Sequence, residues 1–200
     1  MRTRLGRALA ALIAIAVTCV AIVGGCSAGD KEPSSEKPSA SGTPEAPPEK
    51  PSVTTQVVVG RVTGNLRDNQ KAALKDDVKK IVDGFFEGAY LGDFPRASYD
   101  KAYDAFTDGA RQDAKRDKDL LSNAAISDRI ESATGAKRQV SLDVLAVKGV
   151  PQGVTARFTL DFDTAGALEQ RNRVKGFLLL DHEGGKWQIF GYDVIRSVIK

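Results

Sequence analysis

The stretch LKDDVKKIVDGFFEGAY, residues 74–90, decides the fold class. Its apolar side chains recur at helical steps with charged residues between them, which is the pattern of an amphipathic α-helix that buries one face. The apolar face comprises Leu74, Val78, Ile81, Val82, Phe85, Phe86 and Ala89. Gly92 follows as a residue suited to end a helix, and Pro95 starts a new segment. The pattern predicts one long helix with an aromatic face.

Two shorter helices are predicted after it. The stretch PRASYDKAYDAFT, residues 95–107, places Tyr99, Tyr103 and Phe106 on one side of a helix. Thr107 can then cap a third helix over DGARQDAKRDKDLLSNA, residues 108–124, whose charged body is typical of a solvated surface. Residues 126–132 fit either a helix or a strand.

Beyond Gly135 the apolar period changes from helical to two-fold. Residues 140–146 and 154–162 alternate apolar and polar side chains on either side of GVPQG, residues 149–153, which we expect to be a turn. A further hairpin is predicted to turn at HEGGK, residues 182–186. A short strand over residues 54–62 precedes the long helix.

Helices followed by antiparallel strands predict an α+β domain, with the N-terminal helices packed on one face of a curved antiparallel sheet. The run FLLL, residues 177–180, is apolar on both faces of its strand. We therefore expect one face to meet the helices and the other to need a second cover, such as a partner subunit or the remaining chain.

These elements resemble the nuclear-transport-factor-2-like (SnoaL-like) superfamily. The resemblance rests on the helix with Phe85, Phe86 and Tyr90, the stretch YDKAYDAFT, and the hairpin FLLLDHEGGKWQIFGYDV. It implies a cone-like fold over residues 53–200, with an apolar pocket inside the cone and dimerisation through the outer sheet face. Members of the superfamily include isomerases, cyclases, dehydratases and non-catalytic binding modules.

The N-terminus has the pattern of an export signal. Three arginines precede an apolar run over residues 8–23, and Cys26 follows two glycines. The sequence Val23-Gly24-Gly25-Cys26 resembles the lipobox of bacterial lipoproteins, which implies a signal peptide over residues 1–25, lipid on the Cys26 sulfur, and attachment to the extracytoplasmic face of the cell membrane. An uncleaved signal anchor remains the alternative, because the apolar run is close to the length of a spanning helix.

Composition separates a linker from a single domain. Residues 26–52 contain most of the chain's eight prolines and no large apolar residue, which predicts a disordered tether. Residues 53–200 have the size of one domain with one core. Their charges are nearly balanced and interleaved, so they lack the basic stripe that nucleic acid binding requires, and nucleic acid is not an expected partner.

Candidate catalytic groups are few. Asp161 and Asp163 share one face of a strand, where a solvated surface is favoured over an acid–base pair. His182, the single histidine, falls in a turn and is expected to be exposed. Asp193 is the weak candidate for a catalytic residue, because a buried carboxylate there could have the raised pKa that acid–base catalysis uses. No metal or cofactor is predicted.

The sequence thus favours a lipid-anchored envelope protein whose domain binds a small apolar ligand or another envelope protein without catalysis. The pocket that the family resemblance implies is assigned to Phe86, Tyr90, Tyr103, Phe158 and Tyr192. The alternative function is a SnoaL-like enzyme acting on a small hydrophobic substrate. A homodimer built on the two-faced FLLL strand is the third hypothesis.

Overall fold

The computed structural model describes residues 53–200. The predicted signal peptide, the lipidation of Cys26 and the predicted linker, residues 26–52, lie outside the described residues. Within residues 53–200, no helix combines the length and the apolar character needed to cross a membrane.

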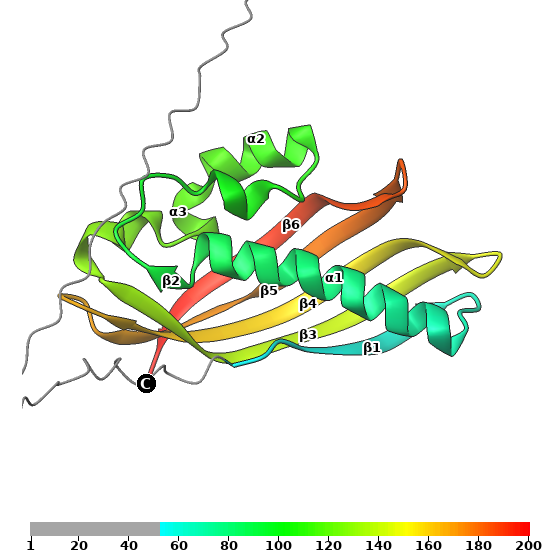
Figure 1. Ribbon diagram of the computed structural model, residues 1–200, viewed down its shortest axis with the longest axis horizontal. Coiled ribbons are helices and arrows are strands. Elements are labelled where there is room, and N and C mark those ends of the chain that lie inside the picture. The colour runs from blue at the N-terminus through cyan, green and yellow to red at the C-terminus, as the bar shows by residue number, and fades with distance from the viewer. Residues whose placement is uncertain (1–52) are drawn as a thin grey trace, which may run out of the picture. The chain divides into compact units, whose positions relative to one another are not determined.

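The described residues form an α+β fold with one open, six-stranded sheet, in the order β1-β3-β4-β5-β6 with β2 paired to β3 (Figure 1). The strands are β1 (Gln56–Thr63), β2 (Gly92–Asp93), β3 (Ser132–Val147), β4 (Val150–Ala165), β5 (Gln170–Glu183) and β6 (Lys186–Ile199). The helices are α1 (Asp68–Ala89), α2 (Asp108–Arg116) and α3 (Lys118–Leu121), with two 3₁₀ turns, η1 (Asp100–Tyr103) and η2 (Ala124–Arg129). The expected α+β class with helices on one sheet face is confirmed.

The long helix predicted from residues 74–90 is confirmed as α1. The backbone amide of Arg67 donates to the Gln70 side chain at its start (3.1 Å), and the helix ends at Ala89 rather than at Gly92. Its apolar face is buried against the sheet and η1. Figure 1 shows α1 running along one face of the sheet, with α2 and α3 next to β6.

The second predicted helix is wrong over most of its length, because only η1 is helical there. After a turn at residues 104–105, Phe106 forms a parallel β-bridge with Ile189: the amide of Ile189 donates to the carbonyl of Ala105 (2.8 Å), and the amide of Thr107 donates to the carbonyl of Ile189 (2.9 Å). These long-range bonds satisfy backbone groups that a helix would have paired locally. Thr107 then caps α2 as predicted, accepting from the amide of Ala110 at 3.4 Å.

The sheet departs from the sequence prediction in two ways. The turn between β3 and β4 is a two-residue turn at Lys148 and Gly149, with φ of 51° and 78°, rather than the longer GVPQG. Two consecutive positive φ values match the twist of a tight hairpin. The sheet is also mixed, because β1 pairs with β3 in parallel.

Candidate functional site

Four of the five predicted pocket residues come together in the core. Phe86, Tyr90 and Tyr103 are at most 1% exposed, and Phe158 is 4% exposed. The Phe86 and Phe158 ring centroids lie 5.4 Å apart, which links α1 directly to β4. Aromatic side chains therefore fill the space between α1 and the sheet at this point, where the family resemblance implied a pocket.

Tyr192 lies apart from this group, at the edge of the core on β6. Its hydroxyl donates to a carboxylate oxygen of Asp117 at 2.8 Å, between α2 and α3. It lines a surface hollow of about 370 Å³ together with Asp113, Arg116 and Phe190. Tyr192 thus links the helices to β6, and its ring centroid lies 6.0 Å from that of Phe106 in the core.

Asp193 does not meet the condition on which its catalytic hypothesis depended. Its side chain is exposed, on the sheet face opposite to the buried Val194. The burial on which the catalytic hypothesis rested is therefore missing. His182 is exposed as predicted, but it lies in β5, two residues before the turn at Gly184 and Gly185, and its ring centroid is 5.0 Å from that of Trp187.

Asp161 and Asp163 are held in ion pairs across to β5. Arg173 contacts both carboxylate oxygens of Asp161 at 2.6 Å, and Arg171 contacts those of Asp163 at 2.7 and 2.8 Å. The guanidinium of Arg173 holds the pKa of Asp161 below its ordinary value, although burial opposes this. A carboxylate held ionised in this way is unsuited to act as a general acid at neutral pH.

The sheet face opposite the helices is the second region of interest. It carries Leu145, Arg157, Phe177 and Ile195, and no helix within residues 53–200 packs on it. We call it the open face. Leu145 and Ile195 are 50% and 65% exposed, whereas their neighbours on the opposite side of the sheet are buried. Exposed apolar side chains on a sheet face that no helix of the described residues covers can contribute to an interaction surface.

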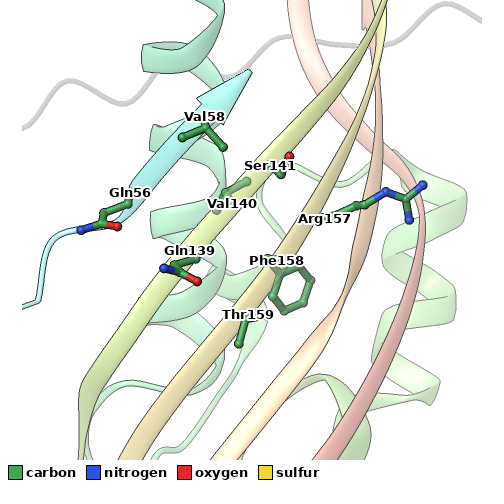
Figure 2. A pocket seen from close by; sticks show the side chains of 8 residues that line it. All are labelled: Gln56, Val58, Gln139, Val140, Ser141, Arg157, Phe158 and Thr159. Carbon is green, nitrogen blue, oxygen red and sulfur yellow. The ribbon is translucent and has the colours of Figure 1, made fainter. Parts of the chain in front are cut away.

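A hollow of about 380 Å³ lies on the open face across β1, β3 and β4 (Figure 2). It is lined by Gln56, Val58, Gln139, Val140, Ser141, Arg157, Phe158 and Thr159. The side chains of Val140 and Phe158 are buried in the core, so the other six offer the groups that a ligand would meet. They combine amides, hydroxyls, a guanidinium and one exposed apolar side chain.

Arg157 supplies the charge of the hollow. Its Nε donates to Asp143 at 3.1 Å, and its guanidinium carbon lies 5.8 Å from the centre of the Phe177 ring. The Arg157 guanidinium holds the pKa of Asp143 below its ordinary value, so Asp143 stays ionised at neutral pH. Phe177 and Leu179, which lie on the open face of the FLLL strand, are half-buried, so this face is only partly shielded from solvent.

Sequence reasoning did not find this hollow. Ser141 and Thr159 were polar positions of alternating strands, and alternation alone predicts a solvated face. The signal that pointed to the open face was the two-faced strand at residues 177–180.

Comparison with protein families, with curated proteins and with solved structures gives no match for this chain. Among residues 53–200, no group of three or more His, Cys, Asp or Glu side chains is placed to hold a metal ion.

Proposed function

We propose that this protein is a lipid-anchored, extracytoplasmic binding protein, whose domain captures another envelope protein on its open face and catalyses no reaction. The observation that carries the proposal is the hollow across β1, β3 and β4, which combines polar side chains with the exposed Val58 on a sheet face without helices. Transient protein interfaces are mixed in the same sense, because they are no more apolar than the rest of a protein surface.

We propose further that the fold is the cone-like, nuclear-transport-factor-2-like one. Support comes from a long α1 lying along one sheet face, a sheet of four consecutive antiparallel strands, and an aromatic interior that joins α1 to β4. In this protein the interior is occupied by its own rings. That packing favours recognition on the outside of the sheet over a substrate pocket within it.

The first test concerns the anchor. In Cys26→Ser the sulfur that would carry the lipid is replaced by a hydroxyl. We expect the wild-type chain to remain with the membrane fraction and the variant to be lost from it, or to keep the unprocessed leader, with altered gel mobility. A single acyl chain gives only marginal attachment, so the diacylglycerol accounts for a large change in partition. Unchanged attachment and mobility would contradict lipidation.

The second test concerns the open face. A photo-crosslinking amino acid at Val58, which is 58% exposed beside the hollow, should give one defined adduct in intact cells of the host. The matched control places the same group at Lys80, which is exposed on α1, and should not give that adduct.

Copurification then measures the interaction itself. Ser141→Arg places a bulky charge in the hollow and should reduce recovery of the crosslinked protein at least ten-fold, whereas Lys80→Glu should leave recovery unchanged. A crosslink to a second copy of this chain would show that the open face forms a homodimer instead of binding another envelope protein. No Val58-specific adduct, or equal recovery with Ser141→Arg, would contradict the proposal.

A further inference from the structure

The two edges of the sheet differ in how their backbone is covered. At the β6 edge, the amide of Thr107 donates to the carbonyl of Ile189, the amide of Ile189 donates to the carbonyl of Ala105, and α2 and α3 lie next to the strand (Figure 1). At the β1 edge, β3 is the only strand of the described residues that pairs with β1. An edge strand presents a row of N–H and C=O groups on its outer side, so β1 can pair with a further strand.

The sequence of β1 has few of the features that keep edge strands from pairing further. The strand, QVVVGRVT, contains no proline, lysine or carboxylate. A register shift between Val59 and Val62 bends its second half, whereas Gln56–Val59 pairs with β3 in regular register. The linker stretch PPEKPS, residues 47–52, is a poor occupant of this edge, because proline has no N–H to donate.

Two hollows of the open face include side chains of β1. Gln56 and Val58 line the hollow of about 380 Å³ (Figure 2). A second hollow, of about 220 Å³, is lined by Arg61, Thr63, Asp143, Val144, Leu145 and Thr155. A strand added at the β1 edge would lie about 4.8 Å away and direct every second side chain to the open face. Those side chains would stand beside Gln56, Val58 and Arg61.

The charges that line the two hollows favour an acidic occupant. They are Arg61, Arg157 and Asp143. The carboxylate of Asp143 already accepts from Nε of Arg157 at 3.1 Å, whereas the guanidinium of Arg61 forms no ion pair within residues 53–200. A second copy of β1 could not supply the missing carboxylate, because Arg61 is the only charged residue of this strand.

We infer that an extended, acidic segment of the captured protein adds to the sheet as a further strand beside β1. The inference rests on the proposed function, because the segment belongs to the protein bound on the open face. Hydrogen bonds to the β1 backbone provide affinity in this arrangement, and alternate side chains provide specificity. We expect an apolar side chain beside Val58 and a carboxylate beside Arg61.

A synthetic peptide of alternating valine and glutamate, VEVEVEVE with blocked ends, is the probe. It is titrated into the full-length protein in a non-ionic detergent, and hydrogen exchange of the backbone amides is followed by NMR. We expect saturable binding and exchange about ten-fold slower at alternate amides of residues 56–59, those that face away from β3. The same peptide methylated on every peptide nitrogen keeps its side chains but cannot join a sheet, so it should not slow this exchange.

Charge reversal at Arg61 tests the acidic character of the segment. Arg61 is exposed, so Arg61→Glu should leave the stability of the free protein unchanged. The dissociation constant for VEVEVEVE should rise about five-fold, and the variant should gain affinity for the lysine counterpart, VKVKVKVK. Lys80→Glu makes the same charge change at an exposed position of α1 and should leave both affinities unchanged.

Three results would overturn the inference: no binding of VEVEVEVE, binding without slower exchange in β1, or equal slowing by the methylated peptide. These failures are distinct from failure of the proposed function. A Val58 adduct in cells without slower exchange in β1 would keep capture on the open face and reject strand addition. Slower exchange in β1 without a Val58 adduct would support strand addition at the edge and reject capture on the open face.

Discussion

Replacing Phe85 with alanine is expected to lower the free energy of unfolding by about 3–5 kcal/mol, the range found for large aromatic side chains removed from protein cores. Phe85 is 1% exposed on α1. Its ring centroid lies 5.7 to 6.2 Å from those of Phe86, Tyr90, Phe106 and Phe158, so the truncation removes contacts with four rings at once. The surrounding rings are held by three separate segments and cannot all move to close the cavity.

Urea denaturation followed through the single tryptophan, Trp187, measures this loss. Lys80→Ala is the matched control, because Lys80 is exposed on the same helix and alanine favours helix; its effect should stay within about 0.5 kcal/mol. A loss below about 1 kcal/mol in Phe85→Ala would contradict the close packing between α1 and the sheet.

Alanine at Gly88 is expected to destabilise the domain, whereas alanine at Gly84, one turn earlier, is expected to stabilise it. A Cβ on Gly88 would lie 2.6 Å from the Cα and 2.7 Å from the backbone nitrogen of Ala102, where η1 crosses α1. Backbone cannot rotate away as a side chain does, so α1 and η1 would have to separate, at a cost of about 1–3 kcal/mol.

Gly84 is exposed, and a Cβ there would meet nothing within 4 Å. The substitution keeps only the gain in helix propensity, about 0.5–1 kcal/mol. Calorimetric unfolding of both variants gives the comparison. Effects of the same sign would show that η1 does not cross α1 at Gly88, because propensity alone favours alanine at both positions.

The sequence predicted part of the candidate sites and missed the rest. The buried face of α1 was predicted correctly. Its residues Leu74, Val78, Val82, Phe85 and Ala89 follow the helical period, which the sequence alone displays. Whether the aromatic rings leave a pocket between them depends on the distance between α1 and the sheet. No single segment of the sequence determines that distance. Phe86 and Phe158 proved to be in contact, and the recognition surface that we propose lies on the other side of the sheet.

Local patterns by themselves determined α1, the cap at Thr107 and the long strands of the C-terminal half, because helical and two-fold periods and capping groups act between residues near one another in the chain. Only the tertiary structure decided the β-bridge between Phe106 and Ile189 and the parallel pairing of β1 with β3. Each of these depends on hydrogen bonds or charges from residues far apart in sequence, whose partners are chosen when the helices pack on the sheet.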